Sequence, residues 1–343
     1  MREVLLHQPG RLESREAPEP PAPGLDQALV AVRRVGICGT DFHAFAGEQN
    51  FFSYPRVLGH ELAVEVLALG PTHADPRISV GDRCAVMPYL TCGRCRPCRA
   101  GRSNCCERVD VLGVTVDGGL HERMLVPMSA LYPRADLTLD QLALVETLGI
   151  GMHAVERGRP EASDSVLVIG VGPIGLAIAQ CLAGRVDSIL VADISELRLG
   201  FAERTAKVET LLAGPNLLSQ VIERSGADLP SLVFDATGSR GSMEQAVAMT
   251  GAGGRLVLVG HTMGVLSLDN PTFHRRELDL HASRNAVAED WAAVVELVAN
   301  DSLDPLPWVT HRSTLETVCT DLPGFADDDH LVKAVVHVGP EES

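Results

Sequence analysis

The spacing of apolar residues changes part-way along the chain. Through about residue 130, short apolar runs such as residues 29–32 and 62–69 are separated by Gly and Pro, as in the short strands of a small all-β domain. From Ser165 onward, apolar runs of strand length alternate with segments of helical spacing. That alternation predicts a parallel sheet with βαβ connections.

The elements predicted for the rest of the chain can be given by residue number. Strands are predicted at 166–169, 189–192, 208–212, 232–234, 256–259 and 278–281. Helices are predicted at 139–156, 174–183, 243–249 and 289–299. A last strand, at residues 333–338, is expected to return to the first domain.

Length and charge narrow the class of protein. The 343 residues are long for one hydrophobic core, so two domains are expected. A formal net charge of −16 argues against nucleic acid or an anionic membrane surface as a partner. No apolar run reaches the ~18 residues of a membrane span, and the mixed segment 1–10 does not resemble a signal peptide. We therefore expect a cytoplasmic protein whose nine cysteines do not form a disulfide framework.

Four cysteines form the most specific pattern. In Cys92-x2-Cys95-x2-Cys98-x7-Cys106, four thiolates can close a tetrahedral site around zinc. Cys105 is adjacent to Cys106, and spacing alone does not choose between them. An iron–sulfur cluster could use the same thiols. We call residues 92, 95, 98 and 106 the cysteine cluster.

A glycine-rich motif follows the first strand of the second part. Gly170-x-Gly172-x-x-Gly175 lies between a predicted strand and a predicted helix, as a dinucleotide-binding motif requires. Asp193 ends the next strand, 23 positions after Gly170 (193 − 170). A carboxylate there suits the ribose hydroxyls and would repel a 2′-phosphate, which favours NAD over NADP. Arg198 lies nearby and could instead serve a phosphate.

Two further segments offer metal ligands. Residues 38–43 contain a thiol, a hydroxyl, a carboxylate and an imidazole, and His60-Glu61 adds an imidazole and a carboxylate. Cys38 and His60 are plausible zinc ligands. A lone Cys or His is more often a packing residue, so the inference depends on finding both ahead of the cysteine cluster and the glycine motif.

These motifs occur in the order seen in a known family. Cys38-Gly39-Thr40-Asp41, Gly59-His60-Glu61, the cysteine cluster and the 170–175 motif resemble the zinc-dependent medium-chain alcohol dehydrogenases. The sorbitol and L-threonine dehydrogenase branch is the most similar, and the resemblance runs through essentially the whole chain.

For the fold, the resemblance implies an α/β protein with a GroES-like β domain and a Rossmann domain that has a doubly wound parallel sheet. The GroES-like domain would comprise residues 1–151 and 285–343, with a structural zinc lobe at about 89–110. The Rossmann domain would comprise residues 152–284. The family also implies a homotetramer or homodimer.

For the metals, the resemblance implies two zinc ions per chain. The catalytic ion would be held by Cys38, His60 and one or both of Glu61 and Glu146. The structural ion would be held by the cysteine cluster, with Cys106 as the last ligand.

Other residues take their expected roles from the same resemblance. Thr40 would pass a proton outward from the substrate, His43 would be a further relay, and Asp41 would accept a hydrogen bond from His60. The residues expected to bind NAD are Gly170, Gly172, Pro173, Ile174, Gly175, Asp193, Arg198, Val259, Gly260, Ser283 and Arg284.

The implied reaction transfers a hydride from a secondary alcohol of a polyol, sugar or sugar acid to NAD. Residues 273–277 and 283–285 resemble bacterial relatives that oxidise galactonate or gulonate, which places a cation such as Arg284 beside a substrate carboxylate. Two alternatives are an L-threonine 3-dehydrogenase-like enzyme and a non-catalytic zinc- and nucleotide-binding relative.

Overall fold

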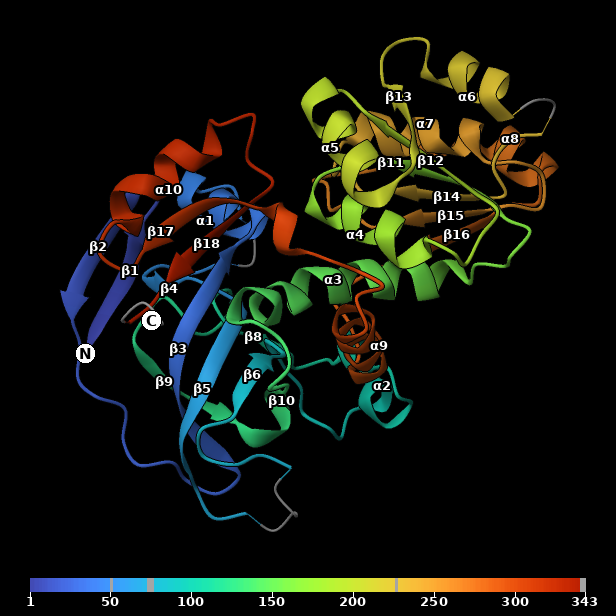
Figure 1. The fold of residues 1–343 in the computed structure, drawn as a ribbon. Helices are drawn as coiled ribbons and strands as arrows, with labels where there is room; N and C mark the ends of the chain where they lie inside the picture. Colours follow the sequence, from blue (N-terminus) through green and yellow to red (C-terminus); the bar gives the residue numbers. More distant parts are fainter. Residues whose placement is uncertain (50–51, 73–76, 226–227, 340–343) are drawn as a thin grey trace. The chain divides into compact units, whose positions relative to one another are not determined.

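The computed structural model describes residues 1–49, 52–72, 77–225 and 228–339. Packing divides the chain into two compact units, Met1–Glu146 with Val295–Ser343, and Thr147–Val294 (Figure 1). The domain limits predicted at 151/152 and 284/285 remain a prediction. Among the described residues, no helix combines the length and the apolar character needed to cross a bilayer.

The first unit is built on β-sheets. A seven-stranded sheet has the order β10-β6-β5-β3-β18-β17, with β9 also paired to β3. Its strands are β3 (Gln27–Ile37), β5 (Glu61–Leu69), β6 (Arg83–Val86), β9 (Arg123–Pro127), β10 (Leu131–Pro133), β17 (Val309–Thr314) and β18 (Lys333–His337). A smaller sheet, β2-β1-β4, comprises β1 (Arg2–Gln8), β2 (Arg11–Glu16) and β4 (Arg56–Val57).

The C-terminal strand completes the sheet that the N-terminal segment begins. β18 pairs antiparallel with the end of β3, where Ala334 is opposite Ile37 and Val335 is opposite Gly36. Apolar residues of both strands are fully buried in the core of this unit. The predicted return of the last strand to the first domain is therefore confirmed.

A small lobe carries the cysteine cluster. It contains β7 (Tyr89–Leu90), α2 (Arg96–Arg99), η1 (Ser103–Cys105) and β8 (Asp110–Val111). β7 and β8 pair with each other in a two-stranded sheet. The lobe has few apolar residues to bury, so a bound metal is the expected source of its stability.

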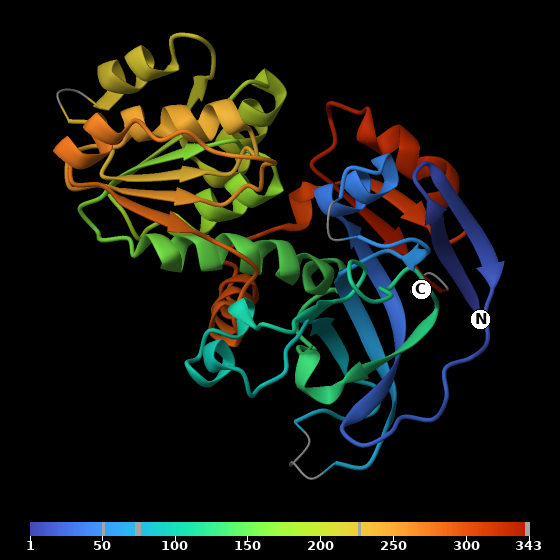
Figure 2. The same ribbon diagram turned by 180° about the vertical axis from the view of Figure 1, so that it is seen from behind.

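The second unit is a six-stranded parallel sheet with the order β13-β12-β11-β14-β15-β16. Helices α4 and α5 cover one face, and α6 and α7 cover the other (Figures 1 and 2). All six predicted strands form, with limits that differ by one residue at most. They are β11 (Ser165–Ile169), β12 (Ser188–Asp193), β13 (Glu209–Leu212), β14 (Leu232–Asp235), β15 (Arg255–Leu258) and β16 (Asp279–Ala282).

The helices agree less completely with the sequence pattern. The four predicted helices form as α3 (Leu139–Gly158), α4 (Pro173–Leu182), α7 (Arg240–Met249) and α9 (Ala288–Ala299). In the described part of the chain, the α-helices that the pattern did not predict are α1 (Gly39–Ala46), α2 (Arg96–Arg99), α5 (Glu196–Ala206), α6 (Leu217–Ser225), α8 (Asn270–Arg275) and α10 (Val318–Ala326). Helix α1 begins directly after Cys38, which is its N-cap residue.

Candidate active site

The four sulfur atoms of the cysteine cluster lie together. The sulfurs of Cys92, Cys95, Cys98 and Cys106 are all within 4.8 Å of one another. Cys95 Sγ is 3.3 Å from Cys98 Sγ and 3.9 Å from Cys106 Sγ, and Cys92 Sγ is 3.5 Å from Cys106 Sγ. Zinc–sulfur bonds of about 2.3 Å in a tetrahedron place sulfurs about 3.8 Å apart. The cluster therefore fits a zinc ion.

Backbone N–H groups favour the thiolate form within the cluster. Hydrogen bonds from the backbone of Arg94 and Cys95 lower the pKa of the Cys92 thiol to about 6. Similar bonds from Cys98 and Glu107 lower the pKa of Cys95. Burial raises the pKa of Cys98 to about 12. The loop thus already stabilises negative charge on two of the sulfurs, as zinc binding needs.

Cys105 and Cys106 differ in their surroundings. Cys106 is 4% exposed and lies with the other three sulfurs. Cys105 is half-buried, and its sulfur is 3.9 Å from Arg102 Nη2 instead. The geometry therefore supports Cys106 as the fourth ligand.

Three other potential ligands meet in the first unit because two neighbouring strands bring them together. Cys38 directly follows β3, and His60 directly precedes Glu61, the first residue of β5. β3 and β5 pair with Gly36 opposite Glu61. One ligand atom from each of Cys38, His60 and Glu61 lies within 4.8 Å of the others. This set, called here the Cys38 centre, fits a zinc ion with an open position for substrate.

Asp41 supports two members of this set. Its Oδ2 accepts a hydrogen bond of 2.9 Å from the Cys38 backbone N–H. Its Oδ1 is 3.8 Å from His60 Nδ1, so the hydrogen bond predicted between Asp41 and His60 is not formed. Burial opposes the imidazolium form of His60, but the charges of Asp41 and Cys38 outweigh it and raise the His60 pKa. Asp41 therefore acts on His60 through its charge.

Glu146 lies outside the Cys38 centre and has a partner of its own. It is 4% exposed, and the Tyr89 hydroxyl donates a short hydrogen bond to its Oε1. Burial and the Glu146 charge hold the Tyr89 pKa well above its usual range, so Tyr89 remains a donor. Of the two glutamates expected as ligands, the structure brings Glu61 to Cys38 and His60. No local motif points to Tyr89, because its partner is 57 positions away in the sequence.

Lys333 is a second residue that sequence analysis missed. It is 2% exposed, and its Nζ is 2.6 Å from Glu61 Oε1. Burial opposes the ammonium form, but the Glu61 charge outweighs it and raises the Lys333 pKa. A buried cation is therefore in direct contact with the Cys38 centre.

The two predicted relay residues lie at different depths. Thr40 is half-buried, and its Oγ1 is 3.9 Å from Cys38 Sγ. His43 is exposed on α1, with Nδ1 3.1 Å from Glu48 Oε2. Their part in proton transfer stays a prediction.

The glycine motif in the second unit leaves room for a ligand. Gly170 has φ +87°, which favours glycine, and Gly172 caps α4. A Cβ on Gly172 would meet nothing within 4 Å, so the space beside it is open. A Cβ on Gly175 would lie 1.8 Å from the Gly170 carbonyl oxygen, so close packing of strand and helix requires glycine there. With Pro173 and Ile174 opening α4, this helix end suits a pyrophosphate.

Asp193 is held at the end of β12 beside the glycine motif. Its Oδ2 accepts a hydrogen bond from Val171 N–H at 2.7 Å, and its Oδ1 accepts one from Ser195 N–H at 2.9 Å. Each carboxylate oxygen keeps further acceptor capacity for ribose hydroxyls. Arg198 is exposed on α5.

The other predicted cofactor residues follow strands of the same sheet. Val259 and Gly260 come after β15, and both donate backbone hydrogen bonds to the Asp235 carbonyl. Ser283 comes after β16, and Arg284 is exposed next to it. These positions lie at the carboxyl ends of parallel strands, where open α/β sheets bind dinucleotides.

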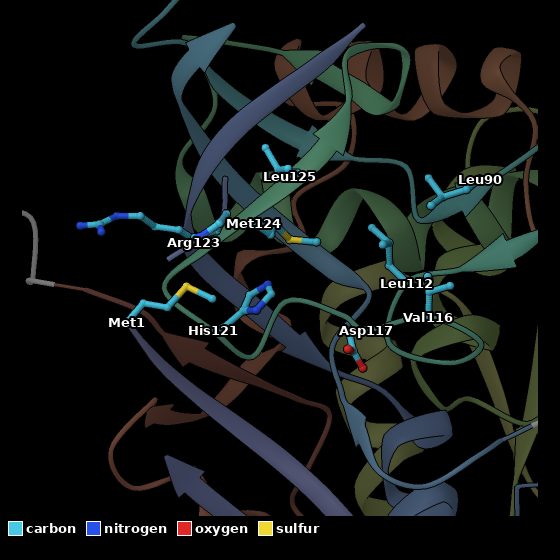
Figure 3. Close-up of a pocket in the computed structure, with 10 residues that line it drawn as sticks. Met1, Leu90, Leu112, Val116, Asp117, His121, Arg123, Met124 and Leu125 are labelled. Atoms are coloured by element: carbon cyan, nitrogen blue, oxygen red, sulfur yellow. The ribbon is translucent and has the colours of Figure 1, made fainter. Parts of the chain in front are cut away.

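A separate hollow of about 390 Å³ lies in the first unit (Figure 3). Its walls are mostly apolar, and the His121 ring lies between Met1 and Met124. Burial lowers the His121 pKa, which favours a neutral ring. None of the predicted site residues is among the residues that line this hollow.

Two protein-family models match the chain. One, described as "Alcohol dehydrogenase GroES-like domain", matches residues 24–136, and the other, "Zinc-binding dehydrogenase", matches residues 170–300. With the parallel sheet described above, these matches confirm the predicted fold class, a GroES-like β domain with a Rossmann domain.

Individual proteins match nearly the whole chain. It is 38% identical over 341 residues to L-galactonate-5-dehydrogenase of Escherichia coli (strain K12), covering 98% of each. It is 28% identical over 324 residues to sorbitol dehydrogenase of Bacillus subtilis (strain 168), covering 92% of this chain and 91% of that protein. A solved structure, described as a short chain alcohol dehydrogenase (rspB) from E. coli CFT073 complexed with cofactor NADH, superposes with a TM-score of 0.90 at 29% identity. It covers 98% of this chain and 99% of that one.

Proposed function

The chain belongs to the zinc-dependent medium-chain alcohol dehydrogenase family, and on this premise we propose that it oxidises a secondary alcohol of a sugar acid or polyol with NAD. It is an oxidoreductase that acts on a small-molecule substrate and uses a nicotinamide cofactor. L-galactonate is the substrate proposed first, because the chain is 38% identical to an enzyme named for it. An arginine such as Arg284 would face the substrate carboxylate.

The observation that carries the proposal is the Cys38 centre. One sulfur, one imidazole and one carboxylate within 4.8 Å of one another form a donor set that zinc accepts and that leaves a fourth position open. When bound there, zinc would act as a Lewis acid that eases loss of the substrate hydroxyl proton. The residues of the chain would hold that hydroxyl in place, and Thr40, near Cys38, would accept its proton while passing its own outward toward His43.

A second zinc ion is proposed for the cysteine cluster. Four cysteines leave no open coordination position, so this ion would stabilise the lobe and take no part in the reaction. Metal analysis separates zinc from iron, the other metal that four cysteines could hold.

The cofactor preference gives a testable prediction. Replacing Asp193 by Asn keeps the side chain's size but removes its charge. We expect the KM for NAD to rise about 10- to 100-fold, because charge-assisted hydrogen bonds to ribose hydroxyls are lost. The preference for NAD over NADP should narrow at the same time, because the charge that repels a 2′-phosphate is gone.

Initial rates with both cofactors measure this effect. Glu196→Ala is the matched control, because it removes a nearby carboxylate at the start of α5. An unchanged ratio of kcat/KM values for NAD and NADP in the Asp193→Asn variant would show that Asp193 does not select the cofactor.

The substrate class is tested by following NAD reduction across a small panel. L-galactonate, L-gulonate, D-sorbitol, L-threonine and 2-butanol should be compared, with the polyol galactitol as the uncharged counterpart of galactonate. The proposal expects the highest kcat/KM with a sugar acid or polyol. A clear preference for L-threonine would instead support the L-threonine 3-dehydrogenase-like alternative. Zinc and NAD binding without turnover of any member would contradict the proposed activity.

Assembly and location are also part of the proposal. We expect a homodimer or homotetramer, since β16 is an edge strand of its sheet and Leu280 on it is 44% exposed. We expect a cytoplasmic enzyme, since all nine cysteines are free thiols.

A further inference from the structure

Glu61 of the Cys38 centre forms a buried ion pair across the sheet. Lys333 Nζ lies 2.6 Å from Glu61 Oε1, with Lys333 2% and Glu61 0% exposed. The chain contains only two lysines, and the other, Lys207, lies in the second unit. Burying an ammonium group is costly unless it is paired with an opposite charge. Glu61 supplies that charge, and it therefore stabilises Lys333 in this buried position.

The pair forms over a glycine. Glu61 belongs to β5 and Lys333 to β18, and β3 lies between these strands. Gly36 of β3 is opposite Glu61 on one side and Val335 on the other. A Cβ on Gly36 would lie 2.0 Å from Glu61 Oε2 and 2.8 Å from Glu61 Cβ. The missing side chain of Gly36 therefore provides the space that the Glu61 carboxylate fills.

We propose that Lys333 and Gly36 position Glu61 so that it offers a metal ion one oxygen only. The inference rests on the catalytic zinc site proposed above. An ammonium and a dication repel each other at short distance, so the carboxylate oxygen that does not face Lys333 is the favoured one for the metal. With Oε1 on Lys333, Glu61 would bind through its other oxygen. A carboxylate that gave both oxygens would fill the position that the substrate needs.

Cobalt(II) in place of zinc tests the coordination directly. Its visible d–d bands are strong when the ion is four-coordinate and several-fold weaker when it is five-coordinate. The spectrum of the Cys38→Ala variant, subtracted from that of the unmodified enzyme, isolates the Cys38 centre from the cysteine cluster. Imidazole added to the unmodified enzyme should shift these bands by occupying the open position.

Lys333→Met should change that spectrum. With the ammonium gone, Glu61 can give both oxygens, so we expect several-fold weaker bands and imidazole affinity lower by about 10- to 100-fold. Lys207→Met is the matched control and should leave both unchanged. Gly36→Ala keeps the lysine charge but places a Cβ against Glu61 Oε2, the oxygen proposed for the metal, so it should also change the bands and the imidazole affinity, by displacing that oxygen. The sulfur-to-cobalt band of the cysteine cluster reports whether each variant has folded.

The outcomes separate the inference from the proposed function. Identical cobalt spectra for the unmodified enzyme and Cys38→Ala would mean that no metal binds at the Cys38 centre, and the proposed function would fail. If the unmodified enzyme gives a cobalt signal from the Cys38 centre but imidazole does not shift it, the open position does not exist and the inference is overturned. The inference would also be overturned if the Lys333→Met or Gly36→Ala variant kept the cobalt bands and the imidazole affinity of the unmodified enzyme.

Discussion

Replacing Cys38 by Ser should lower kcat/KM by about 10³- to 10⁴-fold. Cys38 gives the Cys38 centre its one sulfur ligand atom. Asp41 accepts a hydrogen bond from the Cys38 backbone N–H, which a change of side chain leaves in place. Serine keeps the backbone geometry but is a far weaker zinc ligand at neutral pH. This factor corresponds to a loss of about 4 to 5.5 kcal/mol of the transition-state stabilisation that the Lewis acid provides.

Initial rates and metal content of the Cys38→Ser variant measure the effect together. Cys319→Ser is the matched control, since Cys319 is a half-buried thiol in α10 of the same unit. The control should keep full activity and two zinc ions per chain, whereas Cys38→Ser should keep one. Near-normal turnover by Cys38→Ser would remove the Cys38 centre from the mechanism.

Replacing Cys106 by Ser should release the structural zinc ion and destabilise the first unit. Cys106 is 4% exposed, and its sulfur lies among those of the other three cysteines. Structural zinc contributes its binding free energy to folding, and we expect a loss of at least about 4 kcal/mol. For a unit of about 150 to 250 residues, that loss lowers the Tm by about 8 to 16 °C.

The adjacent thiol supplies the control for this prediction. Cys105→Ser changes the same atom one position earlier, but Cys105 Sγ lies next to Arg102 and outside the cluster. Calorimetry and zinc analysis should find Cys105→Ser close to the unmodified protein. If Cys105→Ser lost the zinc and Cys106→Ser kept it, the ligand assignment would be reversed.

The sequence pattern predicted the central strands of the second unit's sheet closely because these strands are buried on both faces. β14, for example, is buried at every position, and its first three residues form a continuous apolar run, Leu232 to Phe234. Helix α5 was not predicted because Leu199 and Ala202 are its only buried residues and because Gly200, a poor helix former, lies inside it. Helix α10 was missed because Pro323 lies inside it. In both helices the local pattern is weak and tertiary packing decides the structure.

The residues of the candidate site also fall into two groups: those that a short sequence motif identifies, and those that only tertiary contacts bring to the site. Cys38, His60 and Glu61 could be chosen from short motifs, because their side chains have the chemistry of zinc ligands. Lys333 could not, because its partner is 272 positions away and the contact depends on the order of three strands. The open space at Gly36 likewise exists only once β5 and β18 flank β3.

In the proposed mechanism, zinc at the Cys38 centre is required for oxidation of a sugar acid or polyol. The most direct test follows NAD reduction with L-galactonate, or with the best substrate of the panel, while zinc is removed by a chelator and then restored. We predict that activity falls to background as the zinc content drops from two ions per chain to one, and that it returns with added zinc. Full activity in protein that has lost the zinc ion of the Cys38 centre would contradict this mechanism.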